Sequence, residues 1–151
     1  MGTRMKTSIL KAVLASGIAL FLTLAPAAAQ AGEAPNYAWL LFQATNESRA
    51  HHDVHRLDRA FRMSRFAERH SERMANDRRL WHTAGPSRYD AHCFTWGENV
   101  GWTSGDVNDL EKAFMASAGH RQHILDRGFD RVAVGAAKAG GTLWVTVFFC
   151  T

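Results

Sequence analysis

The chain has 151 residues, 46% of them hydrophobic, with 18 basic residues, 14 acidic residues and a formal net charge of +4. Three of the basic residues lie within residues 1–31, which contain no acid, so 15 basic residues remain against 14 acidic ones. The apparent basicity therefore belongs largely to the N-terminus. It gives no support for a nucleic-acid partner, which requires a clustered basic surface.

Residues 1–31 have the pattern of a secretion signal. A basic start is followed by the uncharged stretch 12–29, and alanines with Ala-x-Ala spacing end the segment, as signal peptidase requires. A stretch of ~18 apolar residues could also just span a bilayer as an anchor, but its proline and alanine-rich end favour cleavage. We therefore expect a removed signal at 1–31, one domain at 36–151, and a secreted or cell-envelope protein without a stable transmembrane anchor.

Helices are predicted in the first part of this domain. Apolar residues recur at helical spacing over residues 36–50 and again, with a charged opposite face, over residues 63–76. A third helix, capped by Asp106 or Asn108, should run through Ala118 and break at Gly119.

Strands are predicted in the last part. Residues 95–102 suggest a short extended piece, and residues 131–137 and 142–149 suggest a β-hairpin with its turn at Gly140-Gly141. Helices followed by strands, with no βαβ alternation, indicate an α+β fold.

The cysteines and the arginines of the domain also allow predictions. Cys93 and Cys150 are the only cysteines, and in an oxidising compartment such a pair is expected to form a disulfide. Residues 49–79 carry nine arginines interleaved with acids. This pattern favours a solvated helical face with i, i+4 pairs over a surface for anionic cell-wall polymer or lipid headgroups.

Eight histidines in a small secreted domain raise the question of a metal site. His51, His52 and His55 lie in a polar connection and are expected to be solvated. His70 lies on the apolar face of the second helix, which favours a hydrogen-bonded core histidine over a metal ligand.

Three other residues are candidates for a site. His82 lies where an apolar segment meets a Gly/Pro loop, Glu98 lies between two tryptophans, and His120 follows a helix break with His123 three residues later. Histidines at i and i+3 share a helical face, and two histidines with a carboxylate are the ligand set of many zinc sites. The residues alone leave open whether they form a metal site or have ordinary structural roles.

Four stretches resemble, in order and spacing, the bacterial CAP-domain proteins. They are His82-Thr83, GENVG at residues 97–101, AFMASAGHRQHIL at residues 113–125 and VAVG at residues 132–135. The resemblance covers about residues 37–149. It identifies the chain as a member of the CAP superfamily, which includes cysteine-rich secretory proteins, insect-venom antigen 5 and plant pathogenesis-related proteins.

The resemblance implies an α-β-α sandwich with a central antiparallel sheet between helical layers. It also implies a cleft with two histidines and two acids, in which His82 and His120 match the histidines and Glu98 matches the first acid. In several relatives the two histidines bind a divalent ion, often zinc.

This sequence departs from the family pattern at two positions. Ser117 stands where eukaryotic members carry the second acid, and Glu111, one turn before Phe114, is no obvious substitute, so the full tetrad is expected to be absent. His123 stands where many bacterial members carry Asn, and it could add a ligand or cap the turn.

Two functions follow from this reading. The favoured one is a non-enzymatic extracellular binding module for a lipid, a cell-envelope component or a partner protein, because the second acid is missing and lipid and sterol binding recur in the family. The alternative is a zinc-dependent hydrolase or peptidase, in which His82, Glu98 and His120 hold zinc and a water nucleophile. Glu98 would then be the candidate catalytic residue.

Overall fold

The computed structural model describes residues 32–33, 35–85 and 93–151, so the predicted signal at 1–31 lies outside the described residues. The elements in chain order are β1 (Gly32–Glu33), α1 (Pro35–Ala50), β2 (Asp58–Arg59), α2 (Phe61–Asp77), β3 (Trp96–Thr103), α3 (Val107–Ala116), α4 (Ala118–Leu125), β4 (Arg131–Ala139) and β5 (Thr142–Cys150). Within these ranges, no helix has both the length and the apolar character needed to cross a bilayer.

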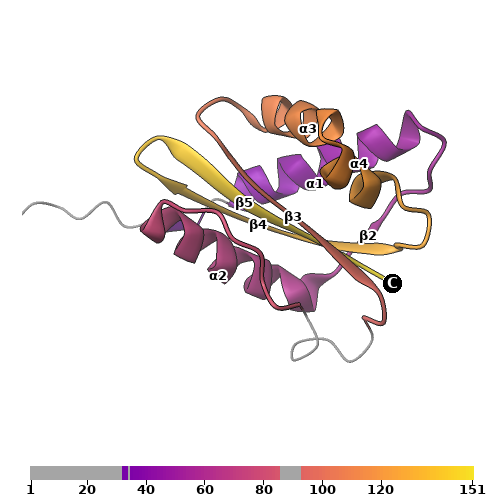
Figure 1. Cartoon of the computed structure of the whole chain (residues 1–151), viewed down its shortest axis with the longest axis horizontal. Helices are drawn as coiled ribbons and strands as arrows, with labels where there is room; N and C mark the ends of the chain where they lie inside the picture. Colours follow the sequence, from indigo (N-terminus) through magenta and orange to yellow (C-terminus); the bar gives the residue numbers. More distant parts are fainter. Residues whose placement is uncertain (1–31, 34, 86–92) are drawn as a thin grey trace, which may run out of the picture.

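A mixed sheet forms the middle of the molecule (Figure 1). Its strand order is β1-β4-β5-β3, and β2 also pairs with β4. The predicted hairpin is confirmed as β4 and β5, which are antiparallel and joined at Gly140-Gly141, both with positive φ, as a tight two-residue turn requires. The pair β2–β4 is parallel, so the prediction of an antiparallel sheet holds for every pair except this one. The two-residue strand β2 carries no periodic pattern that could have revealed it.

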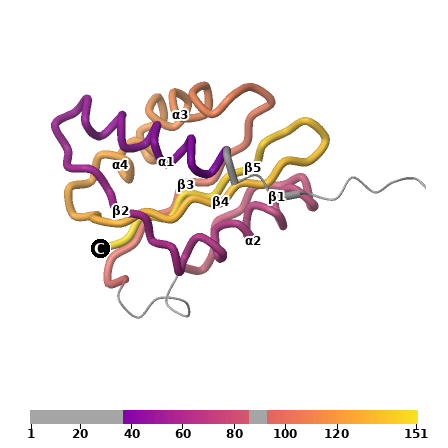
Figure 2. The backbone as a smooth tube through the Cα atoms, turned by 180° about the vertical axis from the view of Figure 1, so that it is seen from behind, coloured from indigo at the N-terminus to yellow at the C-terminus, as the bar shows by residue number. Residues whose placement is uncertain are grey.

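Helices cover both faces of the sheet. α1, α3 and α4 lie on one face and α2 lies on the other (Figures 1 and 2). Alternate strand residues follow this division, since Val134 and Val145 pack in the cluster under α1, α3 and α4, whereas Ala133 and Phe148 pack against α2. The predicted α+β class and α-β-α sandwich are confirmed.

The helix break before His120 differs from the prediction. Asp106 caps α3, because its side chain accepts a hydrogen bond of 2.9 Å from the N–H of Asp109. The helix ends at Ala116, and not at Gly119, because the residue that follows it, Ser117, has an extended backbone (φ −92°, ψ 122°). α4 begins at Ala118, so His120 lies in the first turn of a new helix.

Arg49, at the end of α1, is a second departure from prediction. It is fully buried, so the solvated basic face predicted for residues 49–79 does not include it. Its guanidinium donates to the carbonyls of His55 at 2.7 Å, Ile124 at 2.8 Å, Asp126 at 2.8 Å and Phe129 at 3.3 Å. Burial lowers the pKa of Arg49. The residue therefore ties α1 to the end of α4 and to the connection that follows it.

The predicted disulfide between Cys93 and Cys150 is confirmed. It joins the segment before β3 to the end of β5, across a sequence separation of 57 residues. We expect Cys93→Ser to lower the free energy of unfolding by about 4 kcal/mol, because a bridge across a loop of this length restricts the unfolded chain.

Urea unfolding of both forms, with and without reductant, measures this effect. Reductant should destabilise the native protein by the same amount and leave Cys93→Ser unchanged. Two titratable free thiols in the native protein would contradict the bridge.

Candidate functional site

The carboxylate of Glu98 holds His82 at the free edge of the sheet. Glu98 lies in the edge strand β3 and is 3% exposed, and its Oε2 accepts from His82 Nδ1 at 2.7 Å and from the backbone N–H of Thr83 at 2.9 Å. The side chain of His82 is 62% exposed. With Nδ1 donating to the carboxylate, His82 presents its Nε2 to solvent.

The second oxygen of Glu98 is free to accept another donor. Its Oε1 is buried and has no hydrogen-bond partner within the described part of the chain. A buried acceptor left without a donor is uncommon and often marks a place for water, an ion or a ligand.

Asn99 fixes the two histidines of α4 against β3. Its Nδ2 donates to the backbone carbonyl of His120 at 3.0 Å, and its Oδ1 accepts from His123 Nδ1 at 2.8 Å. No role for Asn99 was predicted from the sequence, although the residue lies within the GENVG stretch. The contact occupies Nδ1 of His123.

Glycines in β3 allow α3 and α4 to approach the strand. A Cβ at Gly97 would lie 2.7 Å from Cδ2 of His123, and a Cβ at Gly101 would lie 2.8 Å from the ring of Phe114. Both distances are shorter than carbon atoms tolerate. The glycines of GENVG therefore have a packing function, which is to bring α4 and its histidines onto the strand that carries Glu98.

His70 holds the segment that carries His82. The ring is fully buried, its Nε2 lies 2.8 Å from the carbonyl of Trp81, and it contacts the Trp81 ring edge-on at 5.3 Å between centroids. The prediction of a hydrogen-bonded core histidine is confirmed. Because Trp81 precedes His82, this contact sets the position of His82 against α2.

An apolar hollow lies beside His120 at the same edge of the sheet. Its volume is about 260 Å³, and Leu80, Trp102, Phe114 and Ser117 line it together with His120. Trp102 is 52% exposed and Leu80 is 39% exposed. Phe114 also packs against His120, with 4.8 Å between the ring centroids. The histidine thus borders an open apolar surface.

A model of the cysteine-rich secretory protein family, CAP, matches residues 42–151. The chain belongs to the CAP family. Membership in this secretory family supports the predicted extracellular location. A comparison with curated protein sequences gives no match.

Solved structures agree with this assignment at the level of the fold. An outer surface protein of Borrelia burgdorferi aligns with a TM-score of 0.73 at 15% identity, over 82% of this chain and 98% of the other. An extracellular SCP-domain protein of Bacillus anthracis aligns with a TM-score of 0.67 at 22% identity, over 77% of this chain and 40% of the other. NaASP2, crystallised with Zn²⁺, aligns with a TM-score of 0.54 at 10% identity, over 78% of this chain and 80% of the other.

The second acid of the CAP cleft has no substitute at Glu111. Glu111 is buried toward α1, where its Oε2 accepts from the hydroxyl of Thr45 at 3.1 Å, and burial raises its pKa. Ser117, where the resemblance would place the second acid, lines the hollow beside His120.

The candidate residues meet at one end of β3, but not as a ready-made metal cluster. Burial lowers the pKa of both His120 and His123, and the nearby His82 lowers it further. Among the described residues, however, no three His, Cys, Asp or Glu side chains are placed to hold one ion. Glu98 is bonded to His82 Nδ1 and is not placed as a third ligand. Within the described residues, the role that the geometry gives Glu98 is therefore to orient His82 and Thr83.

One buried histidine, His70, and two partly buried ones, His120 and His123, predict that this domain loses stability in acid. Burial is the main cause that lowers the pKa of His70, His120 and His123. In the unfolded chain they titrate at about pH 6.5. Below that pH the unfolded state binds protons that the folded state does not, so the free energy of unfolding falls. Glu111 has the opposite effect on stability in acid. Its pKa is raised in the folded state, so protonation of its carboxyl at low pH favours folding.

We therefore expect the urea midpoint to fall between about pH 7.5 and about pH 5.5. His70→Gln removes one titrating ring and retains an N–H₂ donor for the Trp81 carbonyl, so this variant should lose less stability over the same interval. An equal loss in the variant and the native protein would contradict the assignment to His70.

Proposed function

We propose that this CAP domain is an extracellular binding module whose ligand contacts the apolar hollow beside His120. The observation that carries the proposal is the hollow itself, of about 260 Å³ and lined by Leu80, Trp102 and Phe114. Two of these side chains remain substantially exposed, and exposed apolar groups gathered in a concavity are typical of binding sites. A lipid, or an apolar group of a cell-envelope component or partner protein, is the matching ligand chemistry.

The polar rim supports binding over catalysis. Ser117 contributes a hydroxyl where the resemblance places an acid, and the one carboxylate of the pair is committed through Oε2 to His82 and Thr83. His120 and Ser117 are then the polar rim of an apolar site, and the ligand contacts come mainly from Trp102 and Leu80.

Binding of dodecanoate, measured by calorimetry, tests this proposal. Trp102→Ser should weaken binding by roughly tenfold or more, because it removes a large apolar contact. Phe94→Ser is the matched control, since Phe94 is 84% exposed and does not line the hollow. His82→Ala/His120→Ala should retain binding. Absence of dodecanoate binding, or equal loss in both serine variants, would contradict a lipid-binding hollow.

A zinc-dependent hydrolase is the second candidate, favoured by the geometry of the histidine pair. Glu98 orients His82 with Nε2 outward, and His120 has a pKa lowered chiefly by burial, so it is neutral and able to ligate near pH 7. Bound zinc would supply an acidified water as nucleophile. The buried Oε1 of Glu98 is the matching acceptor for a proton donor at the site. The Zn²⁺ in the structure of NaASP2 is consistent with this candidate.

Thermal unfolding with zinc and with chelator separates the two candidates. A ligand that binds only the folded state raises the melting temperature, so zinc should stabilise the native protein and have less effect on His82→Ala/His120→Ala. His51→Ala/His52→Ala removes two exposed histidines as the control. Glu98→Gln should weaken zinc binding, since it alters the partner of His82. Turnover that chelator removes and zinc restores would establish the enzyme, and turnover that survives loss of both histidines would exclude it in this form.

A further inference from the structure

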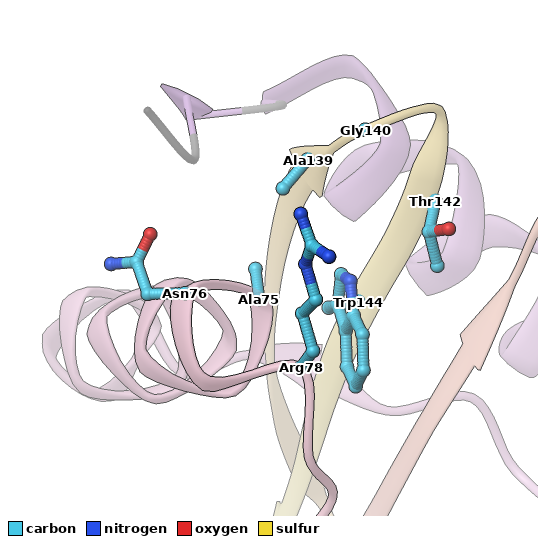
Figure 3. A pocket seen from close by; sticks show the side chains of 7 residues that line it. All are labelled: Ala75, Asn76, Arg78, Ala139, Gly140, Thr142 and Trp144. Carbon is cyan, nitrogen blue, oxygen red and sulfur yellow. The ribbon is translucent and has the colours of Figure 1, made fainter. Parts of the chain in front are cut away.

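A second hollow lies away from the histidines, between the C-terminal end of α2 and the tip of the β4–β5 hairpin. Its volume is about 340 Å³, which lies within the size range of small-molecule sites. Figure 3 shows Ala75 and Arg78 on the helix side and Ala139, Gly140, Thr142 and Trp144 on the hairpin side. None of the side chains that line the hollow is acidic.

Arg78 enters this hollow from the end of α2. Arg78 follows the last residue of α2 in the left-handed conformation (φ 49°, ψ 40°), and its N–H donates to the carbonyl of Met74. This conformation is uncommon for a residue other than glycine. In Figure 3 the side chain of Arg78 extends alongside Trp144 toward Ala139 and Gly140, whereas Asn76 points away.

The charge of Arg78 is not neutralised by the residues that the structure describes. Within them, its guanidinium has neither an ion pair nor a hydrogen bond, whereas the adjacent Arg79 lies over the ring of Trp81 at 5.2 Å. A guanidinium presents a planar set of donors that matches the two oxygens of a carboxylate or a phosphate. Thr142 can add a hydroxyl donor, and the indole of Trp144 can only donate.

We propose that this hollow binds an oxyanion, a carboxylate or phosphate group of a small ligand, with Arg78 as its charged anchor. The lining offers donors around the anion, and the Trp144 ring with the methyl groups of Ala75 and Ala139 contacts the apolar part of the ligand. This hollow adjoins the one beside His120, because Trp144 pairs across the strands with Trp102 and their ring centroids lie 6.3 Å apart. Arg78 lines only the hollow at the end of α2, so the comparison of Arg78→Gln with the native protein tests this site separately from the function proposed for the edge of β3.

An NMR titration of the purified protein tests the site. Inorganic phosphate and N-acetylalanine are added separately at constant ionic strength, and the Trp144 indole N–H and the Arg78 Nε–H are followed. We expect saturable shifts of both signals and at least about tenfold weaker binding in Arg78→Gln, because hydrogen bonds to charged groups are worth this much. Arg79→Gln is the matched control, since it removes the adjacent arginine and should leave the binding unchanged.

The two probes distinguish the source of the oxyanion. Saturation by phosphate alone would assign a phosphate ligand, and tighter binding of N-acetylalanine would assign a carboxylate next to an apolar group. The proposal is overturned if neither probe gives saturable shifts, or if Arg78→Gln and Arg79→Gln weaken binding equally. It is also overturned if Arg78→Gln lowers only the melting temperature, which would mean that Arg78 serves as a cation at the negative end of α2.

Discussion

Gly135→Ala is expected to destabilise the domain by about 3 kcal/mol, at the upper end for overpacking. α2 crosses β4 at Gly135, where an added Cβ would lie 2.1 Å from the carbonyl carbon of Ala67 and 2.2 Å from the backbone nitrogen of Glu68. Because these atoms are backbone, no side-chain rotation relieves the contact and the helix must move. Urea unfolding measures the loss.

The same substitution should disturb the candidate site at a distance. α2 also carries His70, which hydrogen-bonds to Trp81 and thereby positions His82. A displaced helix should therefore weaken the His82–Glu98 contact, which NMR of the His82 ring reports.

Gly119→Ala is the matched control for this prediction. A Cβ at Gly119 would have no heavy atom within 4 Å, and the residue lies inside α4, where alanine is favoured over glycine by up to about 1 kcal/mol. We expect unchanged or raised stability. If both glycine variants were equally stable, close packing of α2 on β4 would not be the reason for glycine at position 135.

Helices and strands with a regular apolar spacing could be predicted from the sequence, because that spacing is visible in consecutive residues. The apolar spacing over residues 36–50 and 63–76 anticipated α1 and α2, and the Gly140-Gly141 turn between two β-rich runs anticipated the hairpin. The parallel pairing of β2 could not be foreseen, since two residues contain no period. The break before α4 was placed too late, because glycine marks a helix end less reliably than the extended backbone that Ser117 adopts.

The site was predicted in a different way. His82, Glu98 and His120 are individually unremarkable residues, and the resemblance to CAP proteins brought them together. Their relation could not be predicted, because it depends on one hydrogen bond from His82 to Glu98 and on the two made by Asn99. Contacts of this kind join residues far apart in the sequence, and no spacing rule reports them.

Arg49→Met is expected to lower the free energy of unfolding by at least about 3 kcal/mol. Methionine fills much of the same volume but has no hydrogen-bond donor. The carbonyls of His55, Ile124 and Asp126, to which Arg49 donates at 2.7 to 2.8 Å, would then lose their donor. An unsatisfied buried acceptor costs more than the bond itself is worth. Since two of these carbonyls lie at the end of α4, that helix should loosen first, and hydrogen exchange of its amides measures this directly.

Position 49 requires a guanidinium group, and a positive charge alone is not sufficient there. Arg49→Lys retains the positive charge, but a single ammonium cannot reach carbonyls spread around a planar guanidinium, so most of the loss should remain. Arg65→Met, on the exposed face of α2, should change stability by no more than about 0.5 kcal/mol. If Arg49→Lys were as stable as the native protein, charge alone would explain the conformation of this region. If the free energy of unfolding of Arg49→Lys lies between those of the native protein and Arg49→Met, the number of carbonyls that are hydrogen-bonded sets the stability of α4. The placement of His120 then depends on the same hydrogen bonds.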